Sequence, residues 1–455
     1  MTEVFMRFSS FENMLSYNAE KRADNTAFRF DEAGEIRSVT FSQFYKDVHA
    51  RKNEIKSLPQ GAVGIYRYGT YGWMKDMFAS VLAGRQTVLI DPSVDGELLQ
   101  KVVIYSDVSV LLTDEATEDE ASSVKLSTAA IPAADGEGDI LFFTSGTTGA
   151  SKAVVLTSAS LCSSAWNGND KLPCLPTDNL LAVLPFCHVF GFVCSMMWPM
   201  SQGACISLGR GFRHLHDDCA YFKPTVISVV PSLLYFLLAK QALNPELRVI
   251  LVGAGPAEEN ALKAAKAMGC EVHFGYGLTE TSSGVAISTG DDPFAMEVCH
   301  DSKITLADDG EILVSCPECM MKGYYKLPDA TAAVLSDGIL KTGDLGRFDE
   351  NGNLHITGRK KDILVLPNGN KIYLPEWESE LTRFLGAQEL AIAMKDGIVT
   401  AIYVDKDGVA DKAELDKKLV EFNRTKPFDK QITALCITDK PLPRTATGKI
   451  KRWML

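Results

Sequence analysis

The sequence predicts an α/β protein, with a large N-terminal domain of layered sheets and helices and a small α+β domain at the C-terminus. The chain has 455 residues, which is more than a single hydrophobic core usually organises. Strand, turn and helix patterns alternate through most of the chain, as they do in α/β layers. From about Lys341 the sequence changes to short β runs between turns rich in Gly, Asn and Asp, and this change indicates a second unit.

The predicted large domain repeats strand and helix patterns. Residues 61–68 and 86–92 are short apolar runs typical of strands, and residues 39–55 predict a strand end followed by a helix with a Ser or Thr cap. Strand, turn and helix recur at residues 227–240 and 247–269. The change in composition places a boundary within residues 358–362, so we expect domains at residues 1–360 and 361–455.

Composition and charge limit the classes of partner. A hydrophobic share of 46% predicts a folded, soluble chain, and the formal net charge is -12. A chain this acidic has no general electrostatic attraction for nucleic acid or for an anionic membrane. We therefore expect no nucleic-acid partner, and any polyanionic ligand must be held by local groups.

The cysteines and the first residues favour a cytoplasmic protein. The opening residues lack the basic and long apolar regions of a secretory signal. All 11 cysteines follow residue 161 and are scattered, which fits reduced thiols better than a disulfide framework. The CPEC motif at residues 316–319 has metal-binding spacing but no second pair or nearby His, so we interpret it as incidental thiols.

Residues 180–200 are long enough to span a bilayer and include no Asp, Glu, Lys or Arg. Pro185, His188, Gly191 and Pro199 interrupt this stretch, and no cluster of positive charge flanks it. We therefore expect a buried core segment or the apolar wall of a ligand site, and no transmembrane segment.

A loop at residues 141–157, LFFTSGTTGASKAVVLT, has the composition of a phosphate-binding site. It is not a Walker A motif, because no Gly-Lys-Ser/Thr occurs and the residues after the lysine are β-like. Glycines free the backbone N–H groups, while hydroxyls and one cation add further donors to a polyphosphate. These groups are Gly146 and Gly149, then Thr144, Ser145, Thr147 and Thr148, then Lys152. The alternative is a Ser- and Gly-rich surface turn.

Four further motifs follow this loop along the chain: GYGLTET at 275–281, KTGDLG at 341–346, GRKKD at 358–362 and PRTATGKIKR at 443–452. With the loop they closely resemble the adenylate-forming superfamily of acyl-CoA synthetases, carrier-protein adenylation domains and luciferases. The resemblance runs from about residue 10 to the C-terminus. It implies an adenylation domain with a mobile lid domain, and a reaction that joins a carboxylate to AMP from ATP with Mg²⁺ and releases pyrophosphate.

The resemblance assigns nucleotide roles to the second and third motifs. Tyr276 stacks on adenine, Thr279 contacts the α-phosphate, and Glu280 binds Mg²⁺. Asp344 holds both ribose hydroxyls. A helix N-terminal acid is the alternative for Glu280, and an Asx turn is the alternative for Asp344.

Other positions also take roles from the family. The backbone of Gly253, Ala254 and Gly255, with Gly275, lines the adenine pocket. Arg359 reaches the ribose or the phosphates. Lys361 falls at the hinge about which the family rotates its small domain.

Two residues of the small domain complete the assignment. Lys449 is the catalytic lysine whose ammonium bridges the substrate carboxylate and the α-phosphate. Gly369 lies beside the path of the CoA pantetheine. The alternative for Gly369 is a plain Asn-Gly hairpin turn.

The acid and its acceptor are less specified. His188, in LPFCHVFGF at 184–192, gates the acyl pocket or shapes the thiol path, unless it is a buried core histidine. No Asp is present nearby to pair an amino-acid ammonium. Apolar runs favour a fatty acid, and the NGNKIYLPEWESEL segment resembles the corresponding stretch of medium- and long-chain fatty acyl-CoA synthetases.

Three functions remain open at this point. CoA is the favoured acceptor of the acyl group. A carrier protein's phosphopantetheine is the first alternative, and a non-catalytic binder of nucleotide or acyl-adenylate is the second. Ser151 and Ala153 depart from the family's Pro-Lys-Gly, and Trp377 replaces a small aliphatic residue.

Overall fold

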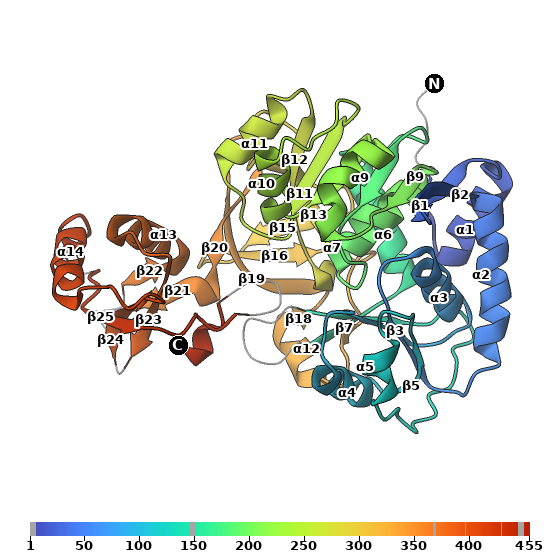
Figure 1. Cartoon of the computed structure of the whole chain (residues 1–455), viewed down its shortest axis with the longest axis horizontal. Helices are drawn as coiled ribbons and strands as arrows, with labels where there is room; N and C mark the ends of the chain where they lie inside the picture. Colours follow the sequence, from blue (N-terminus) through green and yellow to red (C-terminus); the bar gives the residue numbers. More distant parts are fainter. Residues whose placement is uncertain (1–5, 145–151, 367–369, 396, 429, 445–449) are drawn as a thin grey trace.

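The computed structural model describes residues 6–455 except 145–151, 367–369, 396, 429 and 445–449. A large α/β body contains the N-terminal part of the chain, and a small α+β body at the left of Figure 1 contains the C-terminal part. This architecture confirms the predicted fold class.

One sheet of the large body carries the edge where the phosphate-binding loop begins. Its strand order is β17-β7-β6-β4-β3-β5, with β3 to β6 parallel and β7 and β17 antiparallel to their neighbours. The strands are β3 (Ala62–Tyr66), β4 (Thr87–Ile90), β5 (Val108–Leu112), β6 (Ile140–Phe143), β7 (Ala153–Leu156) and β17 (Gly323–Tyr324). Strands β3, β4 and β7 lie where the sequence predicts strands.

The second sheet carries Tyr276, Asp344 and Arg359, and its strand order is β15-β16-β19-β20-β14-β13-β12-β11-β10-β8-β9-β1-β2, with β18 on β19. Its strands are β1 (Thr26–Glu32), β2 (Glu35–Thr40), β8 (Asn179–Ala182), β9 (Cys205–Leu208), β10 (Val226–Val229), β11 (Val249–Gly253), β12 (Glu271–Leu278), β13 (Ser283–Ser288), β14 (Met296–Val298), β15 (Lys303–Leu306), β16 (Glu311–Ser315), β18 (Leu335–Ser336), β19 (Ile339–Phe348) and β20 (Leu354–Arg359). Parallel strands β10, β11 and β12 bring their carboxyl ends to one edge.

The helices of the large body begin where the sequence places polar caps. Thr40 caps α2 by accepting a hydrogen bond from the backbone N–H of Gln43, as the Ser/Thr pattern predicts. The helices are α1 (Phe11–Lys21), α2 (Phe41–Lys56), α3 (Tyr71–Leu82), α4 (Gly96–Tyr105), α5 (Glu118–Ser122), α6 (Ser158–Asn169), α9 (Leu215–Phe222), α10 (Pro231–Ala239), α11 (Glu259–Lys266) and α12 (Pro328–Val334).

Residues 180–200 fold into short buried elements, as expected. Strand β8 is followed by α7 (Val189–Phe192), a π-helical turn at Val193–Met197 and α8 (Trp198–Gln202). Phe192, Met196 and Met197 are fully buried. In the described part of the chain, no helix is both long and apolar enough to cross a membrane.

The small body is a three-stranded sheet covered by two helices. Strand β24 pairs antiparallel with β23 and parallel with β25, and α13 and α14 pack against each other through Trp377 and Phe422. Its elements are β21 (Ile363–Val365), β22 (Lys371–Tyr373), α13 (Leu374–Leu385), β23 (Glu389–Lys395), β24 (Ile398–Val404), α14 (Lys412–Arg424) and β25 (Ala434–Thr438). Trp377 therefore belongs to the core of this body.

The two bodies have separate hydrophobic cores. The buried cluster of the large body reaches Leu354 and Ile356, and that of the small body begins at Leu364 and Leu366. The boundary expected between residues 360 and 361 stays a prediction. The cysteines are all free, and Cys316 and Cys319 are fully buried.

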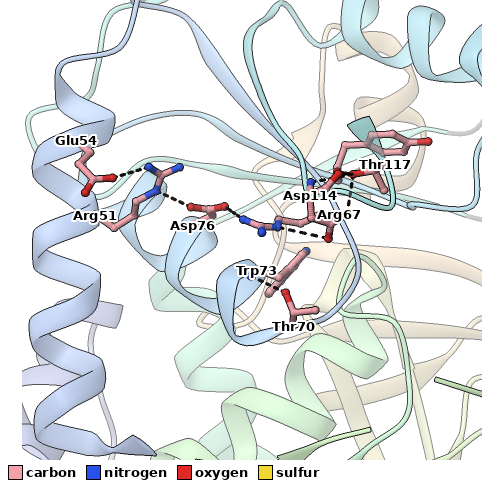
Figure 2. A network of polar contacts seen from close by, with 9 residues as sticks. Arg51, Glu54, Arg67, Thr70, Trp73, Asp76, Asp114 and Thr117 are labelled. Atoms are coloured by element: carbon pink, nitrogen blue, oxygen red, sulfur yellow. Dashed lines mark hydrogen bonds and ion pairs between the residues drawn. The ribbon is translucent and has the colours of Figure 1, made fainter. Parts of the chain in front are cut away.

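A buried carboxylate fixes α2 and α3 to the end of β3 (Figure 2). The Asp76 side chain is only 4% exposed and contacts Arg51 Nε at 2.7 Å. Its second oxygen contacts Arg67, which follows β3 directly. Because Asp76 lies between two guanidinium groups, it neutralises charge that would otherwise stand partly buried.

Replacement of Asp76 with alanine is expected to destabilise the large domain by about 3 kcal/mol, because a buried pair that loses one partner leaves an uncompensated charge. The measurement is the midpoint of urea unfolding. Glu54→Ala is the matched control, since Glu54 contacts the same Arg51 at 2.5 Å but is 63% exposed. Because this ion pair is exposed, Glu54→Ala should change the free energy of unfolding by less than about 1 kcal/mol. Equal shifts for both variants would contradict the prediction.

Candidate active site

A carboxylate, a phenol and a guanidinium meet at the end of the β19–β20 hairpin. Asp344 and Arg359 are register partners in this hairpin, and Arg359 Nε lies 2.6 Å from Asp344 Oδ1. Tyr276, from β12, donates its hydroxyl hydrogen to Asp344 Oδ2 at 2.9 Å. The structure therefore brings together three predicted nucleotide-binding residues that are spread between positions 276 and 359 of the sequence.

The backbone before Asp344 is shaped to present this carboxylate. Gly343 has a φ of +71°, which favours glycine, and its N–H donates to Glu311 Oε1 at 2.8 Å. The Asp344 N–H donates to Thr342 Oγ1 at 3.0 Å. Asp344 is 2% exposed, and burial with the nearby Asp344 charge raises the pKa of Tyr276 well above its ordinary value. Tyr276 is thus a neutral donor.

A second cluster surrounds the predicted magnesium carboxylate. Thr279 and Glu280 form the 3₁₀ turn η3 (Thr279–Thr281), directly after β12. The Tyr324 hydroxyl donates to Glu280 Oε1 at 2.7 Å, and burial followed by the Glu280 charge raises the pKa of Tyr324. Lys152 Nζ lies 4.3 Å from the centre of the Tyr324 ring. Tyr324 therefore contacts both Lys152 and Glu280, the carboxylate predicted to bind magnesium.

Tyr324→Phe is expected to raise the Mg²⁺ concentration needed for half-maximal pyrophosphate release by about 10- to 100-fold, because residues that orient a metal ligand affect metal binding by this factor. The ring remains for Lys152, so only the hydrogen bond to Glu280 is lost. Tyr325→Phe is the control, since Tyr325 donates to Asp107 at 2.8 Å, a carboxylate elsewhere in the fold. An unchanged Mg²⁺ requirement in Tyr324→Phe would contradict this role.

The two ends of the phosphate-binding loop are joined. The Thr144 N–H donates to the Lys152 carbonyl at 2.9 Å, and the Lys152 N–H donates to Thr144 Oγ1 at 3.2 Å. Both residues thus lie at the carboxyl end of β6. The predicted ligands Ser145, Gly146, Thr147, Thr148 and Gly149 lie outside the described residues.

The glycines predicted to line the adenine pocket are neighbours across two strands. Gly253 ends β11 and is paired in parallel register with Gly275 of β12. A Cβ atom on Gly253 would lie 3.1 Å from the Phe190 ring, so glycine permits this approach. Ala254 has a φ of +63°, and Gly255 follows it. These residues share the strand edge that carries Tyr276.

His188 lies at the start of α7, near a carboxylate that follows β4. Its Nε2 lies 3.7 Å from Asp91 Oδ2, and its side chain is 40% exposed. Burial would raise the pKa of Asp91, but the contacts with His188 and Ser93 lower it to about 2. His188 is therefore not a fully buried core histidine, and it lies beside an ionised group.

Ion pairs anchor the residues that precede the predicted hinge, Lys361. Arg359 is held by Asp344, and Lys360 Nζ contacts Glu311 Oε2 at 2.5 Å. All of these partners belong to the large body. The chain is thus fixed to the large body as far as Lys360.

The residues after Lys361 are anchored to the small body. Arg452 Nε lies 3.5 Å from Asp362 Oδ1, and its two Nη atoms donate to the Glu378 oxygens at 2.6 and 2.8 Å. This arrangement leaves Lys361 between two anchored segments, as a hinge requires. The predicted catalytic residue Lys449 and the predicted pantetheine-path residue Gly369 lie outside the described residues.

Tyr324 and Asp91 were not predicted as site residues. Tyr324 is 172 positions from Lys152 in the sequence, and only the pairing of β17 with β7 brings it to the loop. Asp91 is visible in the sequence as a carboxylate after a buried strand. Without the strand order, neither residue can be assigned to the site.

Known proteins are similar to this chain in sequence and in fold. A family model described as "AMP-binding enzyme" matches residues 15–325. A 2-succinylbenzoate–CoA ligase of Listeria monocytogenes is 32% identical over 326 residues, 69% of this chain and 68% of that protein. A long-chain-fatty-acid–CoA ligase of Bacillus subtilis is 32% identical over 359 residues, 71% of this chain and 62% of that protein.

A solved structure agrees over nearly the whole chain. The O-succinylbenzoate coenzyme A synthetase of Bacillus subtilis, in complex with ATP and magnesium ion, has a TM-score of 0.81 and 25% sequence identity. The match covers 97% of this chain and 99% of that chain, so it includes both bodies.

Proposed function

Because this chain belongs to the AMP-binding enzyme family, in its acyl-CoA synthetase branch, we propose that it is an AMP-forming acid–CoA ligase. In the first step a carboxylate oxygen attacks the α-phosphorus of ATP, the bond to the bridging oxygen breaks, and pyrophosphate leaves. In the second step the CoA thiol loses its proton, its sulfur attacks the acyl carbon, and AMP leaves.

The observation that carries this proposal is that one short segment holds both a residue suited to the ribose end of a nucleotide and a residue suited to its phosphate end. Tyr276 and Glu280 are four residues apart around the end of β12. The first lies beside Asp344, an acceptor suited to a ribose diol, and the second lies beside Lys152 of the phosphate-binding loop. This spacing supports a nucleotide whose sugar and phosphates lie at the two ends of the segment.

The residues present also fit the magnesium ion that this reaction needs. Glu280 offers a hard carboxylate oxygen, and Mg²⁺ is usually bound by one or two carboxylates together with substrate phosphates. When bound, Mg²⁺ would neutralise phosphate charge. Tyr324 orients the carboxylate, and Lys152 adds a cation toward the phosphates.

For the acid, we take 2-succinylbenzoate as the first candidate. The Listeria relative carries this activity in its name. Two buried hydroxyls, Ser195 and Ser282, have no hydrogen-bond partner in the described part of the chain. Their chain neighbours Cys194 and Ser283 are in contact, with 3.6 Å between Sγ and Oγ. Unsatisfied buried hydroxyls are costly, so they favour an acid with a second polar group.

A fatty acid is the second candidate. The long-chain relative of Bacillus subtilis supports it, and so does the absence of charged side chains from residues 180–200. An acyl chain needs only an apolar wall, while 2-succinylbenzoate also needs polar contacts.

The test is pyrophosphate release from ATP and Mg²⁺ over a panel of acids that includes 2-succinylbenzoate, benzoate and saturated acids of increasing length. We expect release with 2-succinylbenzoate and consumption of the CoA thiol in equal amount. Pyrophosphate release with long saturated acids alone would rule out 2-succinylbenzoate and favour a fatty acid as the substrate. Release without thiol consumption would favour a carrier-protein acceptor, and no release with any acid would favour a non-catalytic binder.

A further inference from the structure

Three side chains with metal-binding atoms converge beside the phosphate-binding edge. Asp91, Cys187 and His188 place a carboxylate oxygen, a thiol sulfur and an imidazole nitrogen within 4.8 Å of one another. They come from two separate segments, the residue after β4 and the turn before α7. In the described part of the chain, this is the one such group of three.

The carboxylate is held in position for a further ligand. Ser93 donates to Asp91 Oδ1 twice, from its backbone N–H at 2.9 Å and from its hydroxyl at 2.7 Å. The other oxygen, Oδ2, faces His188 Nε2 at 3.7 Å. Carboxylates that bind metals are commonly fixed in this way by hydrogen bonds to the oxygen that does not bind.

The turn that carries the other two ligands is also fixed. The Phe186 ring packs on Trp73 with 5.3 Å between ring centres, and the Trp73 N–H bonds to the Thr70 hydroxyl at the start of α3 (Figure 2). Cys187 is buried, while the His188 side chain is 40% exposed. The exposed His188 ring therefore gives an ion access from solvent to the site that includes the buried Cys187 thiol.

One sulfur, one nitrogen and one oxygen ligand suit Zn²⁺ and not Mg²⁺, which prefers oxygen alone. We propose that Asp91, Cys187 and His188 bind one Zn²⁺ ion, at a site separate from the Glu280 carboxylate. Cys187 binds as thiolate and releases its proton to solvent, and a water molecule completes four ligands. The ligand atoms need to approach one another by about 1 Å to reach ordinary zinc distances.

The site lies next to the first residue of the phosphate-binding loop. In the parallel pairing of β4 with β6, Val88 is opposite Leu141. Asp91 and Thr144 each lie three residues further on, so they end neighbouring strands about 4.8 Å apart. The Asp91 carboxylate and the Cys187 thiolate would offset the two charges of a bound zinc ion, so zinc would raise the local charge beside the nucleotide phosphates by one unit and fix the His188 ring. This consequence rests on the proposed function, and we expect zinc to slow pyrophosphate release.

The binding test needs no enzyme activity. Co²⁺ is titrated into the Cys436→Ser protein, which lacks the exposed thiol. We expect one equivalent to bind with thiolate-to-cobalt absorption, which added Zn²⁺ removes. Adding Cys187→Ser should abolish this absorption, and Asp91→Asn should weaken binding at least about tenfold. Cys205 is a buried thiol elsewhere in the large body, and Cys205→Ser should change neither the absorption nor the affinity for Co²⁺. No thiolate absorption, or the same absorption in Cys187→Ser, would overturn the site.

The activity test separates this proposal from the proposed function. With saturating Mg²⁺ and ATP, zinc should reduce pyrophosphate release several-fold in the parent protein, and a zinc-selective chelator should restore it. Cys187→Ser should keep the zinc-free rate and resist zinc. Equal inhibition of both proteins would overturn the proposal. Absence of pyrophosphate without zinc would overturn the proposed function and leave the cobalt result valid.

Discussion

Replacement of Lys449 with alanine is expected to slow acyl-adenylate formation by at least about 100-fold, the range seen when one group that stabilises a charged transition state is removed. The motif match predicts that Lys449 is the cation between the substrate carboxylate and the α-phosphate. The charge of this lysine is needed only while the bond between the carboxylate oxygen and the α-phosphorus forms. Transfer of the acyl group from supplied acyl-adenylate to CoA should therefore stay close to the normal rate.

Both half-reactions are measured separately, the first as pyrophosphate release and the second as loss of the CoA thiol. Lys440→Ala is the control, because Lys440 is an exposed lysine of the same domain. It should leave both rates unchanged. If Lys449→Ala slows both half-reactions equally, or neither, the assigned role is wrong.

Asp344→Asn is expected to raise the KM for ATP by about 10- to 100-fold, because hydrogen bonds to a charged group contribute about 1.5–3 kcal/mol. The asparagine keeps the shape of the side chain and can still accept from Tyr276. It loses the charge that faces Arg359 and the second acceptor that a ribose diol requires. The measurement is steady-state kinetics with varied ATP, together with a melting curve to show that the protein is folded.

Asp349→Asn is the matched control for this change. Asp349 lies on the same hairpin and accepts from the Asn353 N–H at 2.8 Å, so it holds the turn. That variant should lower stability slightly and leave the KM for ATP unchanged. An unchanged KM in Asp344→Asn would favour the alternative in which Asp344 serves only the hairpin.

The sequence predicted those helices and strands whose capping residues and apolar runs lie within one short segment. Thr40 before an amphipathic run predicted the start of α2, and the apolar runs at β3, β4 and β11 predicted strands. Ordered motifs predicted that Tyr276, Asp344 and Arg359 act on one ligand, and the structure places them in contact. Their roles toward that ligand remain predictions.

Long-range pairing explains what could not be predicted. Tyr324 reaches Glu280 because a two-residue strand pairs with β7, and such a short strand has no periodic signal. Asp91 follows β4 of one sheet and His188 follows β8 of the other, so their contact depends on how the two sheets pack together. Strand order is set by the packing of the whole sheet, so no local stretch of sequence specifies it.

The predicted rotation of the small body about Lys361 can be compared with the ion pairs on the two sides of this residue. Those of Arg359 and Lys360 lie within the large body, and that of Arg452 lies within the small one. Turning the small body about Lys361 would break none of them, so neither orientation is favoured by these contacts. The populations of the two orientations would then follow the ligand that is bound, and a modest difference in affinity would be enough to reverse them.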